Sequence, residues 1–219
     1  MKCALVTMQD QGYRYLTQYT WDQNQLPYCN KHQYPYHIID LDANRGEMNP
    51  GFIKIWTLLE LCKSNPDLDW LLWIDGDALI TNHTIKIEDV ADNKFHFILA
   101  TWFNEINNGV CMVRNSPEGR SYLEYIFSLQ PKYNNHGWVE QQAMIDSFYR
   151  FKDIIKIVPQ RTLNAACYSD GCHTDRTTDL DRLGTDGQWQ PGDWIMHWPG
   201  QHPQMRVALA QKYLQQVIV

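Results

Sequence analysis

The stretch from residue 69 to residue 82, DWLLWIDGDALITN, decides the fold. Its residues 70–74 form a continuous apolar run, which is typical of a strand buried on both faces of a sheet. The run ends at Asp75-Gly76-Asp77, and a second apolar run follows. In α/β sheets, ligands gather beyond the carboxyl ends of the strands. The stretch therefore predicts a buried strand that delivers two carboxylates to a binding site.

Asp75 and Asp77 are two residues apart, so their side chains point to the same side of an extended chain. Two carboxylates ~4 Å apart repel each other by about 1 kcal/mol in water and by ~4 kcal/mol near a protein surface. A cation or a shared proton would offset this repulsion, and Gly76 lets the backbone approach a ligand closely. The simplest interpretation is a divalent metal that bridges the carboxylates to a diphosphate. The alternative is a pair of solvated aspartates, because Asp-Gly-Asp also suits a turn.

A second informative stretch, residues 191–203, reads PGDWIMHWPGQHP. His197 follows a short apolar run, and the loop after it, which contains Gly200, can bring backbone N–H groups to a phosphate. An imidazole beside carboxylates favours a metal such as Mn²⁺ over a site with oxygen ligands alone. A histidine in this place can equally be a hydrogen-bonded core residue.

Outward from these stretches, apolar runs alternate with helical patterns. Strands are expected at 3–8, 36–41, 70–74, 95–100, 109–113, 154–158 and 194–198, and helices at about 13–25, 52–62, 116–130, 138–149 and 207–217. Residues 103–108 are expected to be a polar loop, and residues 164–193 an irregular excursion. The alternation predicts a single α/β domain over residues 1–219, with a largely parallel sheet flanked by helices.

Composition narrows the class of protein. The formal net charge is -6, and no run of Lys and Arg occurs, which argues against nucleic acid as a partner. No stretch approaches the ~20 apolar residues of a membrane span, and no signal peptide is evident, so a cytoplasmic protein or a soluble domain of a larger one is expected. The six cysteines lack the spacing of common zinc sites. We expect them to be reduced, with Cys167, Cys172 and His173 as a weaker metal candidate.

Taken together, these stretches resemble the motifs of GT-A-fold glycosyltransferases. Residues 73–82 are similar to the Trp-x-Asp-x-Asp-x-x-Ile-x-Asn signature of these enzymes, and they look closest to the galactosyl/mannosyl/xylosyltransferase family of fungal and plant Golgi enzymes. Residues 107–116, 140–144 and 192–200 resemble three further blocks of that family in the same order. Residues 52–55 lie where the family carries a helix with Trp-x-Lys. Compact domains of this kind also occur in bacteria and large viruses, so a virus-encoded protein would act in the host cytoplasm.

The resemblance implies a metal, a donor and a reaction. Asp75, Asp77 and His197 would hold Mn²⁺, or alternatively Mg²⁺, and the diphosphate of a UDP-sugar would complete the coordination. A hexose would pass to a glycan or glycoprotein acceptor with retention at the anomeric carbon. The sequence departs from the family pattern at His202, where the family tends to have a lysine.

The same resemblance suggests roles for further residues. The segment from Thr7 to Arg14 would recognise the pyrimidine. Glu140 and Gln141 would position the sugar, while His202 helps to hold the charge of the departing UDP, which could itself accept the acceptor proton. The donor contacts expected in this way are Thr7, Tyr13, Arg14, Lys54, Asp75, Gly76, Asn108, Gly200 and His202.

Several of these residues have a simpler interpretation. Arg14 and Lys54 could be solvated surface residues, and Glu140 could serve the dipole at the start of a helix. Two other functions also fit parts of the sequence. A phosphatase of the haloacid-dehalogenase type uses Asp-x-Asp after a strand, with the first Asp as nucleophile. A non-catalytic sugar-binding module would explain the nine tryptophans, of which Trp102, Trp138 and Trp198 lie in expected loops.

Overall fold

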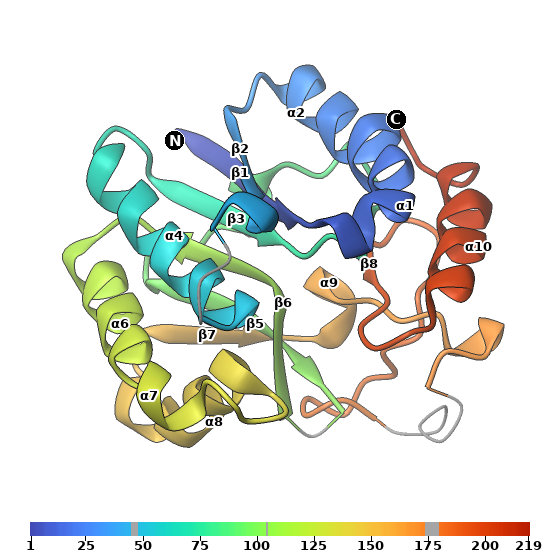
Figure 1. Cartoon of the computed structure of the whole chain (residues 1–219). Helices are drawn as coiled ribbons and strands as arrows, with labels where there is room; N and C mark the ends of the chain where they lie inside the picture. The colour runs from blue at the N-terminus through green and yellow to red at the C-terminus, as the bar shows by residue number, and fades with distance from the viewer. Residues whose placement is uncertain (45–47, 104, 174–179) are drawn as a thin grey trace.

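The protein is seen here as a computed structural model that describes residues 1–44, 48–103, 105–173 and 180–219 (Figure 1). A six-stranded sheet runs through it, and five of its strands are parallel while β6 is antiparallel to both neighbours. In spatial order the strands are β2 (Tyr36–Asp40), β1 (Cys3–Gln9), β3 (Trp70–Ile74), β6 (Glu105–Arg114), β5 (Phe97–Trp102) and β7 (Ile155–Val158). The predicted α/β architecture with a mostly parallel sheet is confirmed.

Strand β3 lies near the centre of the sheet and has the predicted bounds. It pairs in parallel with β1 and antiparallel with β6, and all five of its residues are fully buried. Leu71 and Trp73 pack toward α4 (Pro50–Ser64), and the other three residues pack on the opposite face of the sheet. Burial on both faces explains why this strand is apolar throughout rather than alternating.

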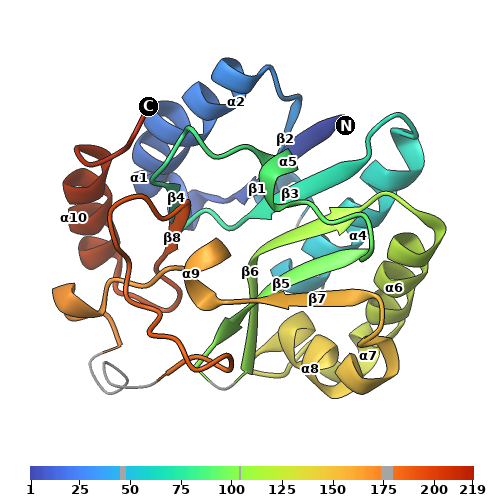
Figure 2. The same cartoon turned by 180° about the vertical axis from the view of Figure 1, so that it is seen from behind.

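Helices cover both faces of the sheet. Helices α4, α6 (Pro117–Ser128) and α8 (Val139–Phe151) pack together on the face toward the viewer in Figure 1. The face seen in Figure 2 carries α5 (Ile87–Val90), α9 (Gln160–Leu163) and a small second sheet. The N-terminal helical segment comprises α1 (Arg14–Thr17), the π-helical η2 (Gln18–Gln25) and α2 (Leu26–His32), and it packs against α10 (Pro203–Leu214). Short elements complete the fold: η1 (Gln11–Tyr13), α3 (Leu41–Asn44), α7 (Gln130–Tyr133) and η3 (Tyr168–Asp170). None of the described helices has the length and apolarity of a membrane span.

The small second sheet brings the two informative stretches of the sequence together. It consists of β4 (Ala78–Ile80) and β8 (Ile195–His197), which run antiparallel with Ala78 opposite His197. β4 is the second apolar run of the Asp-Gly-Asp stretch, and β8 is the short run that precedes the Trp-Pro-Gly loop. Their pairing places His197 next to Asp77 although the two residues are far apart in the sequence.

Several element boundaries differ from the prediction. β6 begins at Glu105 rather than Gly109, so residues 105–108 of the expected polar loop form a strand that pairs with the end of β5. Asn104 of that loop and residues 174–179 of the expected excursion lie outside the described residues. The first helical segment continues to His32. Helix α10 begins at Pro203 because His202 caps it, accepting a hydrogen bond from the backbone N–H of Gln204.

The prediction that all six cysteines are reduced is wrong for two of them. Cys167 and Cys172 form a disulfide with 5.6 Å between their Cα atoms, which also disfavours the metal site considered for this segment. Both sulfur-bearing residues are buried against Trp198 and helix α10. The four other cysteines are free and buried, as expected of small core residues: Cys3, Cys29, Cys62 and Cys111.

Candidate active site

A cavity of about 980 Å³ opens beyond the carboxyl ends of β1 and β3, which is where an α/β sheet places its ligands. Its volume is near the upper end for small-molecule sites. Ten of the residues expected to contact the donor, hold the metal or position the sugar line it: Tyr13, Lys54, Asp75, Gly76, Asp77, Asn108, Glu140, Gln141, His197 and Gly200. The sequence therefore identified most of the polar wall of one cavity.

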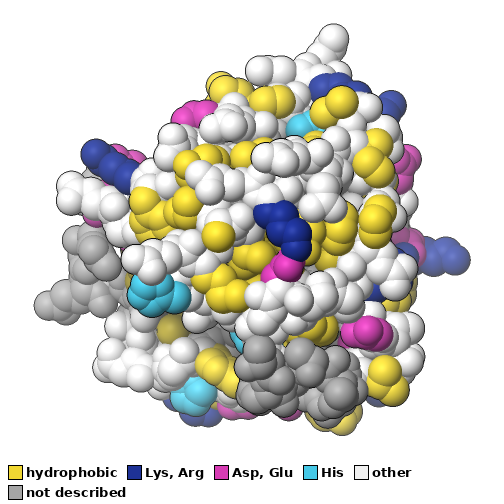
Figure 3. All heavy atoms as spheres, turned by 90° about the vertical axis from the view of Figure 1, so that its right-hand side faces the viewer, with side chains coloured by type: hydrophobic (Ala, Val, Ile, Leu, Met, Phe, Trp, Pro, Cys, Tyr) yellow, Lys and Arg dark blue, Asp and Glu magenta, His cyan; other side chains and the backbone are white. Residues whose placement is uncertain are grey.

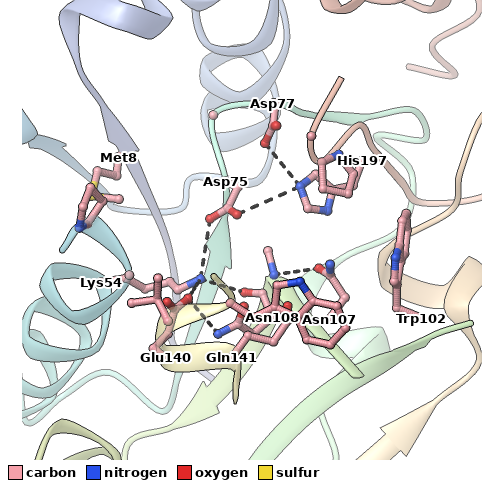
Figure 4. Close-up of a pocket in the computed structure, with 18 of the residues that line it drawn as sticks. Met8, Lys54, Asp75, Asp77, Trp102, Asn107, Asn108, Glu140, Gln141 and His197 are labelled. Atoms are coloured by element: carbon pink, nitrogen blue, oxygen red, sulfur yellow. Dashed lines mark hydrogen bonds and ion pairs between the residues drawn. The ribbon is translucent and has the colours of Figure 1, made fainter. Parts of the chain in front are cut away.

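Asp75, Asp77 and His197, together called the metal cluster below, meet in this cavity. One potential ligand atom from each lies within 4.8 Å of the other two. The Nε2 atom of His197 is 3.2 Å from Oδ1 of Asp77 and 4.0 Å from Oδ2 of Asp75. The three side chains converge in Figure 4. They offer the mixed oxygen and nitrogen set that suits Mn²⁺.

A hydrogen-bond partner behind His197 assigns its proton. The Nδ1 atom of His197 lies 3.0 Å from the side-chain oxygen of Asn164, which is buried. Nδ1 is then the donor to Asn164, and Nε2 faces the two carboxylates. Nε2 would be a ligand atom with a cation between these groups, and without a cation a protonated Nε2 donates to Asp77. The arrangement of this chain's own residues thus fits a bound metal ion.

The two carboxylates of the cluster have different surroundings. Burial raises the pKa of Asp75 above its ordinary value and outweighs the opposing charges of Lys54 and His197. Burial would also raise the pKa of Asp77, but its hydrogen bond with His197 and the charge of Arg206 bring that pKa below its ordinary value. The guanidinium of Arg206 is 2.8 Å from Oδ2 of Asp77. Asp77 is therefore held as an anion.

A glycine on β6 makes room for the cluster. A Cβ atom on Gly109 would lie 2.1 Å from Cε1 of His197 and 2.9 Å from Oδ2 of Asp75. Both distances are below any real contact of a Cβ atom. Only glycine at this position lets the backbone of β6 pass beneath the metal cluster.

A second polar layer, formed by Lys54, Asn108, Glu140 and Gln141, adjoins the cluster (Figure 4). The Nζ atom of Lys54 is 2.8 Å from Oε1 of Glu140 and 3.8 Å from Oδ1 of Asp75. Burial alone would lower the pKa of Lys54, but these two carboxylates raise it above its ordinary value. Lys54 is thus a buried, charged counter-ion between two acids, not a solvated helix lysine.

Asn108 and the start of α8 complete this layer. The amide of Asn108 donates to Oε1 of Glu140 at 2.9 Å, and the backbone N–H of Asn108 donates to Oε1 of Gln141 at 3.3 Å. A Cβ atom on Gly51 would lie only 1.6 Å from Oε2 of Glu140. Glu140 is therefore fixed from several sides, which goes beyond an interaction with the helix dipole.

Three residues expected to contact the donor do not line the cavity. Thr7 is buried in β1, Arg14 is exposed at the start of α1, and His202 is exposed at the N-terminus of α10. Of the tryptophans considered, Trp198 is fully buried in the core, whereas Trp102 and Trp138 line the cavity. The donor contacts expected of Arg14 and His202 remain predictions that would need these side chains to move.

The structure adds residues that the sequence analysis did not single out. Arg206, on α10, pairs with Asp77 and lies 5.0 Å from the centre of the Tyr13 ring. Asn164 supports His197, and Asn107 lines the cavity. Asn107 lies in the block at 107–116, whereas a single arginine or asparagine outside a motif carries no signal in one sequence, so only the fold could reveal Arg206 and Asn164.

Figure 3 shows the face of the molecule that carries α10. Lys and Arg side chains are scattered singly over the part of this face that the structure describes, among neutral and apolar ones. The basic residues near the cavity are instead buried and paired: Lys54 with Glu140, and Arg206 with Asp77. The site thus holds two buried positive charges, and each is paired with a carboxylate.

Comparison with known proteins confirms the resemblance seen in the motifs. The galactosyl transferase GMA12/MNN10 family model matches residues 5–91. An alpha-1,2-galactosyltransferase of Schizosaccharomyces pombe is 27% identical over 191 residues, which are 68% of this chain and 50% of that protein. Xyloglucan 6-xylosyltransferase 4 of Arabidopsis thaliana is 26% identical over 124 residues, which are 50% of this chain and 23% of that protein. The chain spans about half the length of the first of these relatives.

Solved structures confirm the GT-A-type fold. A glycosyltransferase involved in glycosylation of the major capsid of PBCV-1 superposes with a TM-score of 0.71 at 17% identity, over 97% of this chain and 100% of that one. The galactosyltransferase LgtC, solved with donor and acceptor sugar analogs, gives a TM-score of 0.64 at 14% identity, over 98% of this chain and 95% of that one.

Proposed function

We propose that this chain is a metal-dependent glycosyltransferase that moves a hexose from a UDP-sugar to a hydroxyl group of a glycan or other acceptor. The metal cluster carries the proposal, because it lies in a cavity of about 980 Å³ at the carboxyl end of a central strand. The related galactosyl- and xylosyltransferases support it. A phosphatase or a non-catalytic sugar-binding module has no comparable support.

Asp75, Asp77 and His197 would hold the metal, for which we propose Mn²⁺ before Mg²⁺. Their mixed oxygen and nitrogen atoms, and the position of Nε2 beside two carboxylates, support this choice. When bound, such an ion neutralises negative charge on the diphosphate leaving group. The chain itself supplies little free positive charge to the cavity, since Lys54 and Arg206 are already paired with carboxylates.

The donor would extend from the metal cluster toward β1. Tyr13, Gly76 and Met8 line this end of the cavity, and the Tyr13 ring offers a face for a base. The backbone at Gly76 passes so close to β1 that an added Cβ atom would be 3.2 Å from the carbonyl oxygen of Met8. Preference for UDP over GDP is part of the proposal and rests on the family resemblance.

We propose that transfer proceeds with retention and without a dedicated base. The bond between the anomeric carbon and the diphosphate oxygen breaks, the acceptor oxygen bonds to that carbon on the same face, and its proton passes to the departing diphosphate. Glu140 is poorly suited to take this proton, because its carboxylate is buried and already bonded to Lys54 and Asn108. Glu140 would position this layer, and Gln141 would contact the sugar.

The test uses purified protein with Mn²⁺ and a set of UDP- and GDP-sugars. Hydrolysis or transfer from a UDP-sugar that stops when the metal is chelated supports the proposal, and activity on p-nitrophenyl phosphate instead would favour a phosphatase. The anomeric configuration of the product is read by NMR. Inversion, together with complete loss of transfer in Glu140→Gln, would identify Glu140 as a base and contradict retention without one.

A further inference from the structure

Three ring-bearing side chains, Trp102, Phe103 and His173, line one end of the cavity and are called the aromatic rim below. The Trp102 ring is 5.2 Å from His173 and 6.4 Å from His197 of the metal cluster, measured between ring centres. In Figure 4, Trp102 and Met8 lie on opposite sides of Asp75. The rim thus borders the metal cluster at the end away from β1.

The rim is held in place by its own contacts. Phe103 is buried and stacks on Tyr168, with 6.1 Å between ring centres. It has a φ of +52°, a left-handed conformation that is unusual for a phenylalanine. Conformations of this kind are strained and persist where surrounding structure fixes them, often at ligand sites. The Cys167–Cys172 disulfide anchors the segment that carries Tyr168 and His173.

Polar groups adjoin the rim. Trp102 and Glu105 are paired across the hairpin of β5 and β6, so their side chains point to the same face. Glu105 is exposed, lines the cavity and is a hydrogen-bond acceptor. Asn107 lies two residues further along the strand and also lines the cavity. An aromatic surface beside a carboxylate and an amide suits a ligand that has one apolar face and several hydroxyl groups.

From this arrangement we infer that the aromatic rim and Glu105 form the acceptor subsite, and that the acceptor is a neutral pyranoside. The C–H face of its ring would stack on Trp102, and its hydroxyls would bond to Glu105 and Asn107. A pyranose stacked on Trp102 would lie within about one ring width of the metal cluster. The carboxylate of Glu105 would repel a sugar acid at this place. The inference rests on the proposed function, which requires an acceptor but does not say where it binds.

The rival location is Trp138, which also lines the cavity and is 52% exposed. It lies at the start of α8, beside Glu140 and Gln141, which we assign to the donor sugar. Trp102 is paired across the hairpin with Glu105, which is the only unpaired exposed carboxylate among the described cavity residues. This difference favours Trp102 over Trp138 for the acceptor.

The experiment measures saturation transfer by NMR from the full chain to four probes, with UDP and the diamagnetic ion Mg²⁺ present in place of paramagnetic Mn²⁺. These are methyl β-D-glucopyranoside, methyl β-D-galactopyranoside, methyl α-D-mannopyranoside and methyl β-D-glucuronide. The UDP signal is the internal reference for each sample. We expect a signal from at least one neutral glycoside and a weaker one from the glucuronide.

Variants of the protein show where in the cavity the glycoside probe binds. Trp102→Ala should lower the ratio of glycoside signal to UDP signal by about fivefold, since one aromatic contact contributes roughly 1 kcal/mol. Trp102→Phe should restore part of the ratio, and Glu105→Gln should raise the glucuronide signal relative to the neutral probes. Trp56→Ala is the matched control, because Trp56 is 43% exposed on α4 and does not line the cavity.

Two results would overturn the inference. One is a UDP signal from the wild-type chain without a signal from any neutral glycoside. The other is a glycoside signal that survives Trp102→Ala and disappears in Trp138→Ala, which would move the acceptor to the opposite wall. Absence of Mn²⁺-dependent UDP binding would instead contradict the proposed function itself, so the two failures are distinguishable.

Discussion

The two ends of the cavity are built in opposite ways. The metal cluster stands on the ends of buried strands, and each of its charged groups has a partner from a distant part of the chain: Lys54 for Asp75, Arg206 for Asp77 and Asn164 for His197. The aromatic rim begins with Trp102, the last residue of β5, and is held by ring contacts and a disulfide. The matched family region, residues 5–91, contains both aspartates of the cluster and none of the rim.

Such a contrast is expected of a transferase whose donor is shared by related enzymes and whose acceptor differs from one enzyme to the next. A diphosphate with its metal needs fixed charges, which a rigid buried scaffold holds in place. An acceptor is selected by shape and by contacts on loops, which vary more readily than strands do. The predictions below test whether the two ends do differ in this way.

The largest effect is expected from the metal cluster. Asp75→Ala and Asp77→Ala should each abolish the Mn²⁺-dependent stabilisation of the protein by UDP, because one of the three ligands is lost. At a ligand concentration of about 100 Kd that stabilisation is roughly 2.7 kcal/mol, which a thermal-shift measurement detects. Asp22→Ala, at an exposed position on η2, is the control. Mn²⁺-dependent UDP binding by both cluster variants would show that the assignment is wrong.

Two glycines of the same cavity give a sharper comparison. Gly109→Ala would place a methyl group 2.1 Å from the His197 ring, so it should disrupt the cluster and remove most Mn²⁺ binding. Gly137→Ala adds the same methyl group at another point of the cavity wall, where nothing lies within 4 Å. Titration of Mn²⁺ by calorimetry should give a loss of about tenfold or more for the first variant and little change for the second. Similar affinities in both variants would mean that the close approach of β6 is unimportant.

Much of the cluster could be predicted from the sequence because local pattern and function coincide there. The five apolar residues of β3 can only be a strand buried on both faces, and its end fixes where Asp75 and Asp77 emerge. His197 was found for the same reason, at the end of a short apolar run. The family motif then supplied Lys54, Asn108, Glu140 and Gln141, all of which line the cavity.

The rest depends on contacts between distant segments, which one sequence does not record. Arg206 is one basic residue in a helix, and only the packing of α10 brings it to Asp77. The pairing of Cys167 with Cys172 has no characteristic spacing. Residues 105–108 read as a loop because three of them are polar, yet they form a strand beside β5. The three polar residues, Glu105, Asn107 and Asn108, line the cavity rather than the core. His202 was assigned by motif position alone, and its side chain instead caps α10.

An intermediate effect is expected at Arg206, which supports the cluster from behind. Arg206→Gln leaves the Asp77 carboxylate buried without its cation, and breaking a buried ion pair costs roughly 3–5 kcal/mol of stability. Added Mn²⁺ replaces the lost positive charge, so it should stabilise Arg206→Gln more than the wild type when no nucleotide is present. Urea unfolding with and without Mn²⁺ measures both effects, and Arg206→Lys should recover part of the stability. Equal stability of Arg206→Gln and the wild type would show that the pair contributes nothing.

The smallest effect is expected at the rim, from the Cys167–Cys172 disulfide. The bond closes a short loop, since the two residues are five apart, and a loop of this length contributes roughly 2 kcal/mol. For a chain of 219 residues, that corresponds to a fall in Tm of about 4–8 °C when a reductant opens the bond. The double variant Cys167→Ala/Cys172→Ala should melt lower to a similar extent and should not respond to the reductant.

The Cys167–Cys172 disulfide lies next to the aromatic rim, so its reduction can also be followed by the binding of the glycoside. Reduction should loosen the segment that carries Tyr168 and His173, whereas strands β3, β4 and β8 position the metal cluster. The saturation-transfer signal of a neutral glycoside should therefore fall more than the signal of UDP in the same sample. A fall in both signals to the same extent would mean that the disulfide supports the whole cavity, and the distinction between a rigid metal cluster and a separately held rim would be wrong. An unchanged Tm with reductant would show that the bond does not contribute to the fold.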